Sequence, residues 1–110
     1  MLSEKYSKVC RQEDLIEGIG NRFLINDIDI ALFNIKGDIF ALCNVCPHQH
    51  SALIYKGFIE DNCVICPVHG WKFNLKDGKM NNGGNGLNSY PIKIIDGNIY
   101  IKAEEKKTNW

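Results

Sequence analysis

The sequence predicts an all-β fold, a small antiparallel sandwich or barrel made by a single domain. Short runs rich in β-branched and aromatic residues recur at close, regular spacing along the chain. Turn-forming residues separate these runs, and Asp96-Gly97 is the clearest pair because glycine accepts a positive φ without penalty. A chain of 110 residues can bury one modest core, which we expect to span about residues 6–102.

The elements follow one another as short paired segments. A single helical turn is expected near the start, at residues 12–17. Four pairs of β segments come next, each flanking a short polar turn: 28–35 with 39–42, 57–60 with 63–65, 71–73 with 79–80, and 90–95 with 98–101. Residues 81–88 are rich in Gly and Asn and predict an ordered or semi-ordered loop. Residues 103–110 are polar except for Trp110, which predicts a flexible tail.

Composition excludes several classes of function. Lys and Arg together number 13, as do Asp and Glu, so no overall charge favours nucleic acid or an anionic membrane. The apolar runs are far shorter than a membrane span, and the polar start lacks the apolar segment of a signal peptide. We therefore expect a soluble cytoplasmic protein. Five cysteines make an odd number, which favours metal or redox chemistry over a purely disulfide framework.

Two short motifs each offer one sulfur and one nitrogen ligand. Cys46 and His48 form the first, Cys66 and His69 the second, with 17 residues between His48 and Cys66. Two thiolates and two imidazoles can hold a [2Fe-2S] cluster with both sulfurs on one iron and both nitrogens on the other. Two ferric ions, two sulfides and two thiolates sum to about zero charge, against roughly minus two for an all-Cys site. Such a site accepts an electron more readily.

The stretches around these motifs, 46–53 (CPHQHSAL) and 66–73 (CPVHGWKF), resemble the Rieske family, and the likeness runs from about Tyr6 to Lys102. The resemblance implies a Rieske-like sandwich or barrel in which two hairpin loops bind one [2Fe-2S] cluster per chain. It assigns four ligands: Cys46, His48, Cys66 and His69. It also implies that the imidazoles bind iron through Nδ1 and leave Nε2 near solvent.

The same resemblance indicates a low-potential, soluble ferredoxin. High-potential members carry a disulfide between the loops, where this chain has Ser51 and Val68, and two hydroxyl groups, where it has Trp71 and Phe73. Losing hydrogen bonds to the cluster sulfurs lowers the potential, to roughly −150 mV at the low end of the Rieske range. Such ferredoxins are not enzymes by themselves; they carry electrons from a flavoprotein reductase to a terminal oxygenase. A small electron-transfer subunit of a nitrite reductase is a related alternative.

A zinc ribbon is the competing interpretation. Cys43, Cys46, Cys63 and Cys66 form two Cys-x-x-Cys pairs separated by 16 residues, a spacing that also occurs in zinc sites. A proline follows each second cysteine and removes an amide donor that a zinc knuckle would use. In a strand, residues 63 and 66 point to opposite faces, and zinc would leave both histidines unused. Cys43, Cys63 and Cys10 are then expected to be structural.

The remaining expectations concern the surroundings of the ligands. His50 is expected to be exposed, since the family spacing selects His48. Gln49, His50 and Val68 are candidates for the rim of a docking surface. Trp71 and Phe73 are expected to exclude water from the inner iron. Gly70 is expected to permit close approach of the backbone to the cluster or to the other ligand loop. The loop 81–88 is expected to cover the cluster, although it lacks the prolines often found there. The sequence predicts no oligomeric state.

Overall fold

The computed structural model describes residues 6–45, 52–67, 70–80 and 86–103. Within these ranges the chain forms antiparallel strands joined by turns and loops, with two short 3-10 turns and no α-helix. The strands are β1 (Tyr6–Arg11), β2 (Asn21–Ile25), β3 (Ile28–Ile35), β4 (Asp38–Cys43), β5 (Phe58–Glu60), β6 (Cys63–Ile65), β7 (Lys72–Asn74), β8 (Ile92–Ile95) and β9 (Asn98–Lys102). The 3-10 turns are η1 (Gln12–Asp14) and η2 (Ile54–Lys56). The predicted all-β class is confirmed.

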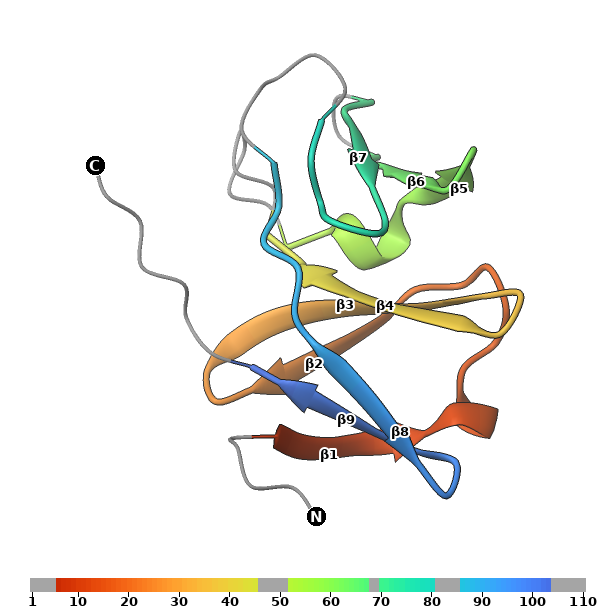
Figure 1. Cartoon of the computed structure of the whole chain (residues 1–110). Coiled ribbons are helices and arrows are strands. Elements are labelled where there is room, and N and C mark those ends of the chain that lie inside the picture. The colour runs from red at the N-terminus through yellow and green to blue at the C-terminus, as the bar shows by residue number, and fades with distance from the viewer. Residues whose placement is uncertain (1–5, 46–51, 68–69, 81–85, 104–110) are drawn as a thin grey trace.

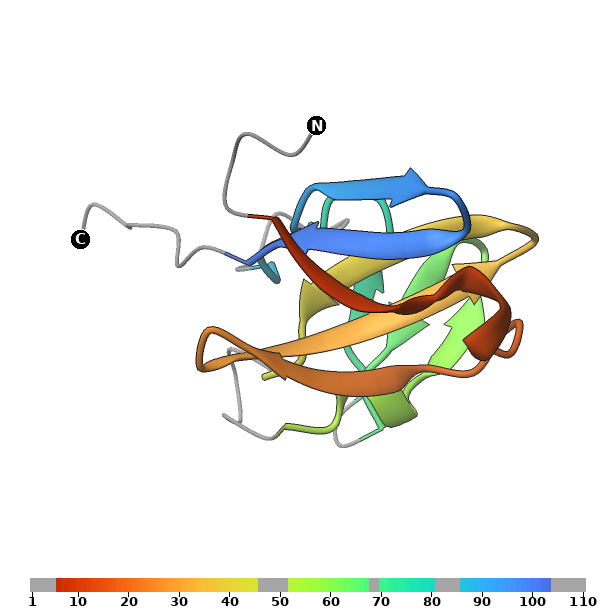
Figure 2. The ribbon, with the colours of Figure 1, turned by 90° about the horizontal axis from the view of Figure 1, so that it is seen from below.

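Three sheets of three strands lie one above another (Figure 1). The central sheet has the order β2-β3-β4, and the terminal sheet, order β1-β9-β8, lies on one side of it. Figure 2 shows the terminal sheet from below, with β9 between β1 and β8. The small sheet, order β5-β6-β7, lies on the other side of the central sheet.

The central sheet buries both of its faces. Along β3, Ile30 and Leu32 pack into a core shared with the terminal sheet, here called the terminal core. Ala31 and Phe33, which alternate with them, pack into a second core shared with the small sheet, here called the loop core. All four side chains have an exposed fraction of 0%. Strand β3 therefore reads as a nearly continuous apolar run, since neither face requires polar residues.

Two-residue turns close three of the four expected hairpins. Lys36-Gly37 joins β3 to β4, Asp61-Asn62 joins β5 to β6, and Asp96-Gly97 joins β8 to β9. Both residues of each turn have a positive φ, between 50° and 89°. That backbone twist matches the twist of the strands it connects, which is why Gly, Asn and Asp are favoured there.

The expected hairpin that pairs 71–73 with 79–80 is wrong in its second half. Residues 79–80 form no strand; instead the Gly78 N–H donates to the Asn74 carbonyl (2.7 Å) and the Asn74 N–H to the Lys79 carbonyl (2.8 Å). The residues after β7 thus close a compact turn, and β7 pairs with β6 alone.

The expected strand 90–95 begins later than predicted, at Ile92. Before it, Ser89 forms a bridge with Leu42, and the Tyr90 N–H donates to the Ala41 carbonyl (3.0 Å). These residues extend the edge of the central sheet before the chain crosses to the terminal sheet. Pro91, at the crossing, has no N–H with which to continue the pairing.

The expected helical turn at 12–17 is shorter, and two strands were not anticipated. The turn covers Gln12–Asp14 only. Strand β1 pairs with β9 at the other end of the chain through a register shift between Lys8 and Cys10, and β2 pairs with β3. No helix within the described residues is long and apolar enough to span a membrane.

Candidate metal centre

One of the four predicted ligands, Cys66, lies within the described residues. Cys46, His48 and His69 lie outside them, as do the predicted rim residues 49–50 and Val68. The described residues nevertheless include both ends of each ligand loop and of the Gly- and Asn-rich loop. These ends, the loop stems, show how the backbone presents the ligand segments.

The stem of the first ligand loop is closed by Asn44, which follows β4. Its side-chain Nδ2 donates to the Ala52 carbonyl (3.1 Å), and its Oδ1 accepts from the Tyr55 N–H (2.8 Å). Its main-chain carbonyl also accepts from the Ile54 N–H (3.2 Å). These three bonds join Asn44, two positions before segment 46–51, to residues that follow the segment. Sequence reasoning missed Asn44; an isolated polar residue between a β-rich run and a ligand motif was its only signal.

The second ligand loop is closed at Cys66, directly after β6. Its N–H donates to the Trp71 carbonyl (2.8 Å), and its carbonyl accepts from the Gly70 N–H (2.9 Å). Gly70 has a φ of +72°, and no described atom lies within 4 Å of where its Cβ would be. The left-handed backbone of the turn favours glycine here. The expected close approach of the backbone to the cluster or to the other ligand loop involves groups outside the described residues and stays a prediction.

The stem of the third loop connects to the first. The Leu87 N–H donates to the Gly78 carbonyl (2.7 Å), which closes the loop on itself. The Cys43 N–H donates to the Asn88 carbonyl (2.8 Å), one residue before Asn44. Of the predicted loop 81–88, residues 81–85 lie outside the described ranges.

All three stems meet at the loop core. Ile54 from the first loop, Cys66 from the second and Leu87 from the third are buried in this one cluster of side chains. Phe73 is fully buried there and Trp71 packs against it, with ring centroids 6.5 Å apart and planes tilted by 46°. The expectation that these two rings exclude water at the ligand loops is consistent with this packing.

Cys66 fits an iron ligand by burial and by backbone support. Its exposed fraction is 1%, and both of its main-chain polar groups are hydrogen-bonded within the loop. A thiolate bound to a cluster needs a fixed backbone and little water, because solvent exposure and hydrogen bonding both tune such a site. The described part of the donor set therefore fits a [2Fe-2S] cluster.

The other described cysteines behave as structural thiols. Cys43 is partly buried, and burial is the main cause that raises its pKa; its Sγ lies 3.8 Å from the Val45 carbonyl oxygen. Cys63 is buried within β6. Cys10, in β1, has its pKa raised by burial and by nearby Asp14. Buried and partly buried thiols of this kind pack as small apolar residues.

The zinc alternative requires Cys43, Cys63 and Cys66 to come together. Among the residues that the structure describes, no three His, Cys, Asp or Glu side chains gather closely enough to hold a metal ion. The three described members of the supposed ribbon are therefore not brought together.

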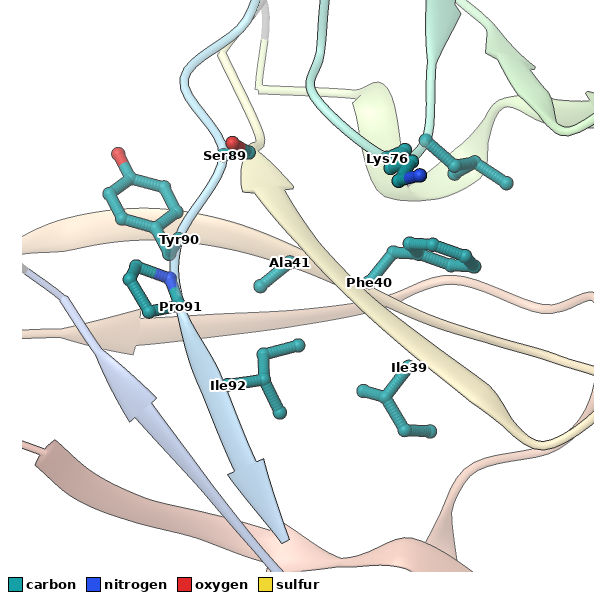
Figure 3. Close-up of a pocket in the computed structure, with 9 residues that line it drawn as sticks. Ile39, Phe40, Ala41, Lys76, Ser89, Tyr90, Pro91 and Ile92 are labelled. Carbon is teal, nitrogen blue, oxygen red and sulfur yellow. The ribbon is translucent and has the colours of Figure 1, made fainter.

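An open hollow elsewhere on the molecule is not part of this centre. It lies between β4 and the segment leading into β8, and Figure 3 shows Ile39, Ala41 and Ile92 between those two strands. Lys76 is the one charged side chain among the residues that line it. None of the predicted ligands contributes to it, so we assign it no role in metal binding.

Comparison with known proteins identifies the family. A family model described as a Rieske-like [2Fe-2S] domain matches residues 5–102. The 3-phenylpropionate/cinnamic acid dioxygenase ferredoxin subunit of Photorhabdus laumondii is 38% identical over 102 residues, covering 90% of this chain and 95% of that one. The ferredoxin component of the alkene monooxygenase system of Xanthobacter autotrophicus is 32% identical, covering 91% and 83%.

A solved structure agrees with the fold. The chain described as the small subunit of an NADH-dependent nitrite reductase from Mycobacterium tuberculosis superposes with a TM-score of 0.82 at 27% identity, covering 87% of this chain and 92% of that one. Relatives over nearly the full length are named as ferredoxin components, that is, electron-transfer proteins rather than catalysts. The chain therefore belongs to the Rieske-like [2Fe-2S] domain family, as an electron-transfer protein that carries a Rieske cluster.

Proposed function

We propose that Cys46, His48, Cys66 and His69 hold one [2Fe-2S] cluster per chain. We further propose that the chain, acting as a single domain in the cytoplasm, accepts electrons from a flavoprotein reductase and delivers them to a terminal oxygenase. The observation that carries the ligand assignment is the convergence of three loop stems on one core that contains Cys66. The bound cluster supplies a site that holds one electron.

The chain's own residues perform the supporting work. Hydrogen bonds across each stem hold the ligand segments, so that changing the charge of the site requires little rearrangement of the backbone. Phe73 and Trp71 keep water from the inner side of the second loop. Neither ring offers a hydroxyl group at the positions where high-potential members have one, which favours a potential near the low end of the family range, roughly −150 mV.

The names of the relatives support the choice of partners. Ferredoxin components of a dioxygenase and of a monooxygenase system align with most of this chain. The structural likeness to a nitrite reductase small subunit favours a second candidate, delivery of electrons within a nitrite reductase. The two candidates share the cluster and differ only in the acceptor.

Ligand substitution tests the assignment. We expect purified protein to contain iron and acid-labile sulfide in equal amounts, and His48→Ala or His69→Ala to lose the Rieske electron paramagnetic resonance (EPR) signal. His50→Ala is the matched control and should keep it. Retention of the signal in His48→Ala, or a colourless protein with stoichiometric zinc, would refute the proposal.

Acceptor tests separate the two candidate partners. The reduced protein is mixed with a ring-hydroxylating oxygenase or with the large subunit of a nitrite reductase, and reoxidation is followed by visible absorption. Faster reoxidation by the oxygenase supports the proposal, and faster reoxidation by the nitrite reductase supports the alternative. Protein-film voltammetry gives the potential; a value well above zero would contradict the low-potential assignment.

A further inference from the structure

Asn44 is the one polar or charged residue that is buried among those the structure describes, with an exposed fraction of 0%. A buried amide is costly unless its hydrogen-bonding groups are satisfied. Here both hydrogens of Nδ2 and the Oδ1 atom are used. Such a fully satisfied buried polar group specifies one arrangement of its surroundings, because any other arrangement leaves the amide without partners.

The partners of Asn44 lie on two sides. On one side are the Ala52 carbonyl and the N–H groups of Ile54 and Tyr55, which follow the first ligand segment. On the other side is Asp29 of β3, whose Oδ1 accepts from Nδ2 (3.0 Å) and whose carbonyl accepts from the Asn44 N–H (2.9 Å). Asn44 thus connects the stem of the first loop to the central sheet.

Asp29 is in turn held by Arg22 of β2. The Arg22 Nε lies 3.0 and 3.1 Å from the two carboxylate oxygens, and Nη2 lies 2.8 Å from Oδ2. The Asp29 side chain is 14% exposed and that of Arg22 45%. The hydrogen bond to Asp29, followed by its charge, raises the pKa of Arg22. A bidentate pair of this kind fixes orientation as well as distance.

We propose that Asn44, oriented by Asp29 and Arg22, is a positioning residue that sets the placement of the first ligand loop and thereby the retention and electronic structure of the cluster. The proposal rests on the proposed ligands Cys46 and His48, which lie between the two ends that Asn44 joins. Asn44 acts through the backbone of the loop: its bonds hold residues 52–55 against the end of β4.

The chain offers a matched control for a purely structural role. Asn34 is partly buried and, like Asn44, joins two backbone segments: Nδ2 donates to the Leu15 carbonyl (3.3 Å), and Oδ1 accepts from the Gly37 N–H (3.1 Å). These partners belong to the turn after β3 and the segment after η1, not to a loop stem. Loss of the Asn34 bonds should lower stability without reaching the ligand loops.

The experiment compares Asn44→Ala with Asn34→Ala in the cluster-loaded protein. Both variants should lower the unfolding midpoint. Only Asn44→Ala, which removes three side-chain hydrogen bonds, should shift the g-values of the reduced cluster and release iron to a chelator at least about tenfold faster. If Asn44→Ala leaves the g-values and iron release as in wild type, or if Asn34→Ala changes both to the same extent, the proposal is overturned.

Two additions keep the test decisive. Should Asn44→Ala not fold, Arg22→Met changes only the exposed end of the network and should have the same effects at smaller size; wild-type behaviour would overturn the proposal. Hydrogen exchange at the Tyr55 and Ile54 amides should be faster in Asn44→Ala and in Arg22→Met than in wild type, and this measurement does not require a bound cluster. A wild-type protein without cluster would refute the proposed function, whereas unchanged exchange would refute the positioning role.

Discussion

The two cores on either side of the central sheet are built differently. On the terminal side, strands of four to eight residues pair through two-residue turns, and the core comes mainly from alternating side chains of β3, β4 and β9. On the loop side, the small sheet has strands of three residues, and a few individual hydrogen bonds close each connecting loop. A pattern of side chains thus specifies one half, and individual contacts specify the other. Substitutions in the second half should therefore alter the site more than the fold.

The largest expected loss of stability comes from substituting neighbouring residues of β3 that face opposite cores. Phe33→Ala should lower the free energy of unfolding by about 3–5 kcal/mol and Leu32→Ala by about 2–5 kcal/mol, because each side chain is fully buried. Phe33→Ala should also speed iron release to a chelator, since Phe33 packs in the loop core. Chemical denaturation gives the stabilities. Equal iron release from variants of equal stability would show that the two cores are not functionally distinct.

A smaller loss of stability is expected when either of two glycines with positive φ is replaced by alanine. Gly37, in the β3–β4 turn, has a φ of +89° and open space around it, so Gly37→Ala should cost only about 1–2 kcal/mol of backbone strain. Gly78 has a φ of +77°, and a Cβ there would collide with the Leu87 carbonyl oxygen. Gly78→Ala should cost at least about 1 kcal/mol more and loosen the third loop. Thermal unfolding measures the costs; equal values would argue against a close-packed stem.

The smallest effect is a pH dependence at the boundary between the cores. Cys43 packs against both, and burial raises its thiol pKa above the ordinary value of 9.0. A raised pKa in the folded state gives a stabilisation that is fully present below the unfolded pKa and is lost as pH rises from that value through the higher folded pKa. The difference in unfolding midpoint between wild type and Cys43→Ala should therefore shrink above pH 9.0. A difference that stays constant to higher pH would contradict the raised pKa.

Sequence reasoning succeeded where the signal is local. The strand Ile28–Ile35 and the hairpin around Asp96-Gly97 were predicted with nearly their observed bounds, because β-rich runs and turn residues act over a few neighbours. Strand β1 was missed because its partner, β9, lies at the other end of the chain and its register is shifted at Cys10. Such non-local pairing leaves no trace in a short window.

The candidate site likewise has one part that local sequence predicts and another that it does not. The predicted β segment 63–65 implied that Cys66 directly follows a strand, and the structure confirms that place. Asn44 could not be predicted, because its importance depends on bonds to Asp29 and to residues 52–55 that only the folded chain brings together. The assignments of Cys46, His48 and His69 stay predictions.

The closure of the loops at their bases has a consequence for how such a carrier can diversify. Most of the bonds that seal the second and third loops join main-chain groups, which almost any residue can supply. The sequence of the loop between these two ends can then change without disturbing the sheets to which it is attached. Proteins built in this way can vary their loop tips, and with them the reduction potential or the redox partner, while the supporting sheets keep their structure.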